Sequence, residues 1–177
     1  MKKLIFLFAF AAMVTLSCDE IDKLTQFKMP YNESIVISSS TVINLPFDIF
    51  TPDISTNSSS TFEGYDTAAD LIEKIKLGSL KLTLTSPSDA NFSFLQSVNI
   101  YISAEGLSEE KIAWKESIPE SIGKTLELET STVNLKEYII KDKIKLRVNT
   151  VTNRVLTSDH HIDINAVFNV DAEILGQ

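Results

Sequence analysis

Cysteine is almost absent from this sequence of 177 residues, in which Cys18 is the only one. A single cysteine cannot form a disulfide within the chain, so a disulfide-stapled fold is excluded. The sequence also has only two histidines, and it contains neither a Gly-x-Ser-x-Gly nor a His-Glu-x-x-His motif. We therefore expect no catalytic residue, no cofactor and no enzymatic activity.

Basic residues are also scarce, because 16 lysines and arginines stand against 24 acids, for a formal net charge of −8. Loss of an N-terminal segment containing Lys2 and Lys3 would make the chain still more acidic. A surface of that sign repels phosphate groups and anionic lipid headgroups. We therefore expect no nucleic-acid partner.

The longest apolar run lies at the N-terminus. Lys2 and Lys3 precede a stretch from Leu4 to Val14 without a charged side chain, and Ser17 directly precedes Cys18. This layout is typical of an export signal. The run is shorter than the roughly 20 residues that a membrane-spanning helix needs. Residues 1–17 are therefore predicted to be a signal peptide.

The segment Thr15-Leu16-Ser17-Cys18 resembles the lipobox of bacterial lipoproteins, although Thr15 stands where that family prefers an aliphatic residue. The resemblance covers the first eighteen residues or so. It implies that the sulfur of Cys18 receives a diacylglyceryl group and that the new amino group is acylated. Two or more acyl chains hold a protein stably at a membrane. Ordinary signal cleavage after Ser17, which would export the chain with an unmodified thiol, is the alternative.

Three of the four residues that follow the cysteine are acids. Asp19, Glu20 and Asp22 resemble the signal that sends lipoproteins of the Bacteroidota to the outer face of the outer membrane. The resemblance implies a surface-exposed lipoprotein. The alternatives are the periplasmic face of the envelope and a plain solvated tether.

The domain organisation follows from where regular patterns begin. Residues 18–33 have no clear period and contain Pro30, so they are predicted to be a lipidated cysteine and an acidic tether. Residues 34–177 show regular patterns and have the size of one globular domain with its own core. We expect a single domain there.

Apolar and polar residues alternate in most of this region. Leu80, Leu82 and Leu84 alternate with polar residues, and Ile162 to Ile174 is the most regular such segment. About eight segments of this kind predict strands that are buried on one side. The expected fold is mainly β, an antiparallel β-sandwich that is immunoglobulin-like in general architecture. Pro46 marks an edge strand because proline cannot donate to a ladder.

Two segments have helical rather than alternating spacing. Residues 66–78 are predicted to form a helix with Asp66 as its N-cap, and residues 134–141 a shorter one. Trp114 lies two residues after Ile112 in an alternating segment, so we expect both side chains in the core.

Residues 51–66 form a long polar segment between these patterns, and loops of that length are usually functional or disordered. Phe62 and Tyr65 give it aromatic surface for a sugar ring or a partner protein. The alternative is that both rings pin the loop to the core. Thr67, which follows Asp66, resembles an acceptor for O-glycosylation in exported Bacteroidota proteins, and helix capping by Asp66 explains the same residues.

Two short motifs have weaker chemical meaning. His161 and Asp163 would share one side of a strand, but a zinc site needs three or four ligands. We expect a solvent-facing histidine pair, His160 and His161, and no metal. Ser121 and Lys124 match a Ser-x-x-Lys spacing without its companion motifs, which favours a turn.

These features support one main functional hypothesis and two alternatives. The main hypothesis is a lipid-anchored, non-catalytic binding module for a glycan or a protein partner. The first alternative is an accessory subunit of an outer-membrane complex that uses an exposed sheet edge. The second is a hydrolase, which would need two carboxylates converging in a cleft.

Overall fold

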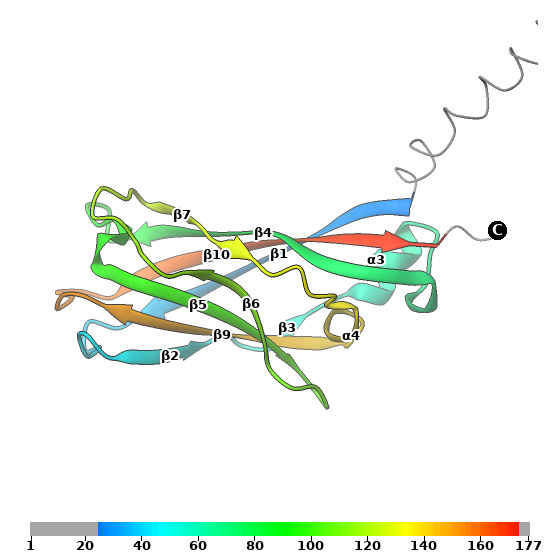
Figure 1. Ribbon diagram of the computed structural model, residues 1–177, viewed down its shortest axis with the longest axis horizontal. Coiled ribbons are helices and arrows are strands. Elements are labelled where there is room, and N and C mark those ends of the chain that lie inside the picture. Colours follow the sequence, from blue (N-terminus) through cyan, green and yellow to red (C-terminus); the bar gives the residue numbers. More distant parts are fainter. Residues whose placement is uncertain (1–24, 174–177) are drawn as a thin grey trace, which may run out of the picture.

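The computed structural model describes residues 25–173 as ten strands in two sheets (Figure 1). Sheet A, in the order β1-β10-β4-β7, contains β1 (Gln26–Ile37), β10 (His160–Ala172), β4 (Ile72–Ser86) and β7 (Thr125–Glu127). Sheet B, in the order β2-β9-β5-β6-β8, contains β2 (Pro46–Phe50), β9 (Lys143–Thr152), β5 (Leu95–Ala104), β6 (Glu110–Lys115) and β8 (Glu129–Thr130). The short β3 (Ile54–Ser55) also pairs with β9. The predicted antiparallel β-sandwich is confirmed.

The strand pairing is nested along the chain. β1 pairs with β10, β2 with β9, β4 with β7, and β5 with β6. The chain is thus one long antiparallel ribbon folded over into two sheets, which is the arrangement of a double-sheet jelly roll. An immunoglobulin domain instead places its first strand beside its second in one sheet. The general architecture of two packed antiparallel sheets is as expected, and its strand order, which the sequence does not predict, is that of a jelly roll.

Alternation places one face of each sheet in the core. In β10 the buried face carries Ile162, Ile164, Ala166, Phe168, Val170 and Ala172. These side chains join those from the inner face of sheet B in one hydrophobic cluster. Full burial of each large apolar side chain contributes about 1.5–3 kcal/mol, so the inner positions fix the register. The outer positions are left to polar side chains.

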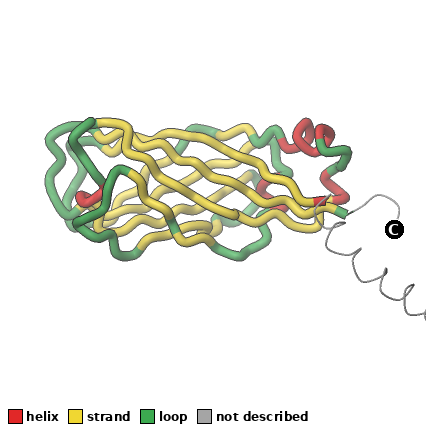
Figure 2. Tube along the Cα trace, turned by 90° about the horizontal axis from the view of Figure 1, so that it is seen from above, coloured by secondary structure: helices red, strands yellow, loops and turns green. Residues whose placement is uncertain are grey.

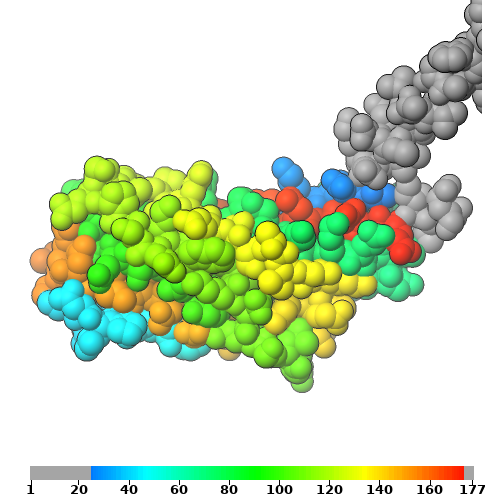
Figure 3. Space-filling model, viewed as in Figure 1, coloured from blue at the N-terminus to red at the C-terminus, as the bar shows by residue number. Residues whose placement is uncertain are grey.

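The sandwich is elongated, and its two ends differ (Figure 2). At one end, which we call the terminal end, the described chain begins and finishes, because Gln26 pairs with Asp171. Helices α3 (Ser58–Gly64) and α4 (Lys136–Ile139) also lie there. The space-filling view shows atoms of β1, β10 and β4 close together at this end (Figure 3). Connecting loops gather at the opposite end, the loop end.

β1 begins well before the expected start of the domain. Residues 26–33 pair with β10, so the expected tether is wrong for this stretch. Met29 and Tyr31 face inward, and Pro30 is tolerated because β1 is the edge strand of sheet A. Pro46 begins β2, an edge strand of sheet B, as predicted.

The predicted helix over residues 66–78 is wrong. The structure has a single 3-10 turn, η1 (Ala69–Leu71), and then β4. The register with β10 skips one residue after Ile72, so both Ile72 and Ile75 face the core at a spacing that mimics a helix. The shorter helix predicted over residues 134–141 is confirmed as α4.

A second bulge explains the position of Trp114, which we expected in the core. The register between β5 and β6 makes Ile112 an extra residue. Ile112 and Ala113 are therefore both buried, and Trp114 turns outward. Its indole nitrogen donates to a carboxylate oxygen of Glu129 at 3.0 Å.

The outer face of sheet B carries an ion-pair network centred on Arg147 of β9. Its guanidinium donates to both carboxylate oxygens of Glu109, at 2.8 and 2.5 Å, and to Asp48 at 2.8 Å. It also lies over the ring of Tyr101 at 4.1 Å. The amide of Asn149, which donates at 2.7 Å, and then Arg147 lower the pKa of Asp48. Arg147 likewise lowers the pKa of Glu109.

Candidate functional site

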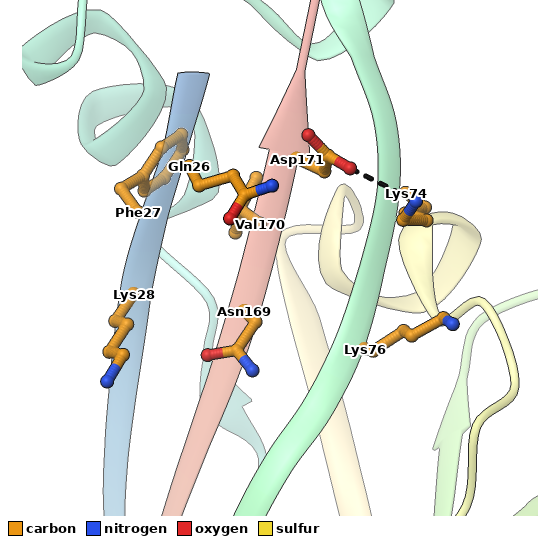
Figure 4. A pocket seen from close by; sticks show the side chains of 8 residues that line it. All are labelled: Gln26, Phe27, Lys28, Lys74, Lys76, Asn169, Val170 and Asp171. Atoms are coloured by element: carbon orange, nitrogen blue, oxygen red, sulfur yellow. Dashed lines mark ion pairs between the residues drawn. The ribbon is translucent and has the colours of Figure 1, made fainter. Parts of the chain in front are cut away.

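A groove of about 530 Å³ lies on the outer face of sheet A at the terminal end (Figure 4). Its floor is formed by β1, β10 and β4, whose opposite faces are buried in the core. We call it the lysine groove, and its lining residues are Gln26, Phe27, Lys28, Lys74, Lys76, Asn169, Val170 and Asp171.

One row of polar side chains crosses the groove. Lys28 of β1 pairs in register with Asn169 of β10, and Asn169 pairs with Lys76 of β4. Neighbouring strands lie about 4.8 Å apart. The three side chains therefore project from adjacent positions on one face of the sheet.

A second row lies two residues from the first on each strand, towards the terminal end. It contains Gln26, Asp171 and Lys74, in which Lys74 and Asp171 form an ion pair at 3.1 Å. Lys28 and Lys76, in contrast, form no ion pair with any residue between 25 and 173. A glycosidase-type hydrolase needs two carboxylates flanking the scissile bond, whereas this groove has Asp171 alone.

Gly78 shapes the floor of the groove. The register between β10 and β4 shifts after Val167, which leaves Gly78 as an extra residue in β4. The amide of Asn169 lies directly over it, because a Cβ at Gly78 would come within 2.5 Å of Asn169 Nδ2. Glycine within a strand often marks such a close approach. Here the absence of a side chain at Gly78 leaves room for the Asn169 amide.

The predicted binding loop, residues 51–66, is largely ordered as β3 and α3. Phe62 is 1% exposed and belongs to the core, as the alternative interpretation had it. Tyr65 is 54% exposed and stacks on Phe27, with ring centroids 4.0 Å apart. Phe27 lies on the α3 side of β1, so this aromatic pair borders the groove without covering its polar rows.

The hydroxyl oxygen of Thr67 is buried and has no hydrogen-bond partner within residues 25–173. A sugar cannot reach it in the folded chain, so O-glycosylation at Thr67 stays a prediction that requires attachment before folding. Asp66 does not cap a helix. It follows α3 with a φ of 53°, in the left-handed region.

The two histidines do not form a solvent-facing pair. His160 is buried against Phe94, with ring centroids 4.4 Å apart, and its Nδ1 lies 2.9 Å from the carbonyl oxygen of Ser158. His161 and Asp163 point outward from sheet A, as predicted. In the described part of the chain, no group of three or more His, Cys, Asp or Glu side chains could hold a metal ion.

Ser121 and Lys124 lie in the turn before β7, as expected. The ammonium group of Lys124 donates to the carbonyl of Ser88, and its own carbonyl accepts from the amide of Leu84. The ammonium group and the backbone carbonyl of Lys124 therefore both stabilise the turn.

A smaller hollow of about 240 Å³ lies at the loop end. Arg154 and Asp89 line it, and the guanidinium of Arg154 donates to the carbonyl of Ser93 at 3.0 Å. Val155 also lines it and is 69% exposed. The sequence patterns had not indicated this hollow.

The sequence patterns also did not indicate the residues of the lysine groove. Lys28 fell within the expected tether, and Lys74 and Lys76 fell within the expected helix. The alternation of these two lysines with Ile75 and Leu77 was a usable signal, but the bulge after Ile72 concealed it.

The residues predicted to anchor the chain, Cys18, Asp19, Glu20 and Asp22, lie outside the described residues, so lipidation and surface export stay predictions. Among residues 25–173, no helix has the length and apolar character to cross a membrane.

No family model matches this chain, and no curated protein matches it. Similar solved structures include that of Desmodium yellow mottle tymovirus, at 14% identity over 86% of this chain and 84% of that one, with a TM-score of 0.31. The structure of turnip yellow mosaic virus is 10% identical over 86% of this chain and 96% of that one, with a TM-score of 0.30. That of cocksfoot mottle virus is 7% identical over 85% of each chain, with a TM-score of 0.26. The jelly-roll description rests on the strand order of this chain alone.

Proposed function

We propose that this chain is a lipid-anchored, non-catalytic binding module of the bacterial cell envelope that binds a glycan in the lysine groove. The groove itself is the observation that carries the proposal. Its volume of about 530 Å³ suits a small polar ligand, since ligand sites occupy roughly 300–1,000 Å³. The amides of Gln26 and Asn169 can donate to and accept from sugar hydroxyls.

The predicted anchor on Cys18 supports this proposal. Residues 19–25 can span at most about 25 Å when fully extended, and β1 enters the groove at Gln26. An acylated Cys18 would therefore keep the groove near the outer membrane, where envelope glycans are concentrated.

Two measurements test the proposal. The intact mass of the mature N-terminus, with protease accessibility on whole cells, reports whether Cys18 is acylated and which face of the membrane the domain occupies. A bare thiol at Cys18 would remove the anchor from the proposal.

Glycan binding is tested with the full chain in a nonionic detergent and polysaccharide fragments prepared from the same envelope. We expect Asn169→Ala to lower the amount of retained sugar. Asn165→Ala makes the same change on β10 outside the groove and serves as the control. Equal retention by both variants and the native chain would contradict binding in the groove.

An accessory subunit of an envelope complex is the second candidate, and the edge of sheet B favours it. β2 is an edge strand, and Phe50 at its end is 59% exposed. Exposed edges accept a strand from a partner. A stoichiometric protein that co-purifies with the native chain and is lost from Phe50→Ser would support this candidate over the glycan binder.

A further inference from the structure

The lysine groove has a local charge opposite in sign to that of the whole chain. The sequence has a formal net charge of −8, yet three lysines and one acid line the groove. Lys74 and Asp171 neutralise each other at 3.1 Å. Lys28 and Lys76 lack an ion-pair partner anywhere in residues 25–173. Two like charges held near each other repel, so this arrangement favours an anionic ligand between them.

The geometry allows both lysines to reach one ligand. Lys28 and Lys76 flank Asn169 in a single row, on strands about 10 Å apart by the usual strand spacing. Figure 4 shows their ammonium groups on opposite sides of the Asn169 amide. The four-carbon stem of lysine is flexible, so both groups can close over that amide. An anion seated there would receive donors from three strands.

We infer that the lysine groove binds a phosphate group carried by a larger polar molecule, either a sugar phosphate or a lipid headgroup. The lysine ammonium is a compact point charge with three donors, and lysines commonly bind phosphate in this way. The volume of about 530 Å³ leaves room for more than the phosphate, and Gln26 lies ready to bind a neighbouring hydroxyl. This inference rests on the proposed function and names the ligand class for the same groove.

The net negative charge of the whole chain makes the row of Lys28, Asn169 and Lys76 selective among anions. An anion approaching from solution meets a repulsive field that acts over about 10 Å at 0.1 M salt. Within residues 25–173, the groove places two lysines that lack ion-pair partners, Lys28 and Lys76, on either side of one amide. The site is therefore expected to select ligands that fit the row and to reject nucleic acid, whose many phosphates would also be repelled by the net negative charge of the chain.

The test is calorimetric titration of the full chain, in a nonionic detergent, with glucose 6-phosphate, glycerol 3-phosphate and uncharged glucose. The first phosphate represents a sugar and the second a lipid headgroup. Lys28→Gln and Lys76→Gln are each expected to weaken phosphate binding about tenfold or more. Lys81→Gln removes the same charge from β4 outside the groove and should leave binding unchanged. Circular dichroism checks that each variant is folded.

Binding of either phosphate compound, weakened by Lys28→Gln and Lys76→Gln alone, supports the inference, and the compound that binds more tightly identifies the source of the phosphate. The inference is overturned if neither compound binds. It is also overturned if Lys81→Gln weakens binding as much as Lys28→Gln, because long-range charge would then explain the affinity. Glucose bound in preference to both phosphates would overturn it while leaving the proposed glycan function in place.

Discussion

Replacement of Arg147 by alanine tests how the outer face of sheet B is held together. Arg147 is 20% exposed, whereas Asp48 and Glu109 are 39% and 36% exposed. Ion pairs that are this accessible contribute about 0.2–1 kcal/mol each, and the cation above the ring of Tyr101 adds about 0.5–1 kcal/mol. We therefore expect Arg147→Ala to lower the free energy of unfolding by about 2 kcal/mol. Urea denaturation followed by circular dichroism measures this change.

Arg147→Lys keeps the charge and loses the two-pronged contact with Glu109, so it should retain about half of this free energy. The effect also depends on pH. The pKa values of Asp48 and Glu109 are lowered in the folded state. The two carboxylates therefore stabilise the fold fully above their pKa values in the unfolded chain, which lie near 4. This stabilisation is lost as the pH falls through their lower pKa values in the folded chain. The reasoning is refuted if Arg147→Ala changes stability by under about 0.5 kcal/mol at neutral pH, or if its effect persists undiminished in acid.

Three further variants test the core, a partly buried hydroxyl and the groove floor. Phe62→Ala should cost about 3–5 kcal/mol in a denaturant titration, because Phe62 is 1% exposed; a cost below about 1 kcal/mol would restore the binding-loop interpretation. Burial raises the pKa of Tyr31 to about 12, and its hydroxyl donates to the Thr56 carbonyl. Stability should therefore fall as the pH rises from 10 towards 12, and Tyr31→Phe should abolish this dependence at a cost of about 1 kcal/mol. Gly78→Ala should displace the Asn169 amide and weaken ligand binding, with a change in stability under about 1 kcal/mol; unaltered binding would show that the amide is not used.

The fold class could be predicted because the alternation of apolar and polar residues within each strand can be seen in a short stretch of sequence. Strand order could not, because nesting depends on which distant segments pair. The errors fall at irregular positions. The bulges after Ile72 and at Ile112 each add one residue to a strand, which reverses the faces that follow. When the apolar spacing is followed across such a bulge, a strand can look like a helix, as it does for residues 66–78. An outward side chain such as Trp114 can likewise be assigned to the core.

The lysine groove could not be predicted for a related reason. Its central row joins Lys28, Asn169 and Lys76, which are far apart in the sequence and meet only because β10 lies between β1 and β4. The two aromatic residues of the predicted binding loop differ in the same way. Composition marked residues 51–66 as exposed, but Phe62 packs against Phe27 and is buried, whereas Tyr65 stays 54% exposed.

Nested pairing also explains why the groove and the beginning of the described chain coincide. In a ribbon folded over in this way, the first strand must lie beside the last, and the last pairs on its other side with β4. The N-terminal strand therefore supplies one wall of the groove through Lys28 and also continues towards the predicted anchor at Cys18. Because Lys28 is fixed in register with Asn169, a pull along β1 would be borne by the hydrogen bonds of the whole β1–β10 ladder. A strand shorter or less regularly paired than β1 would transmit movement of the tether into the groove, whereas this one can keep the binding geometry independent of how the chain is held.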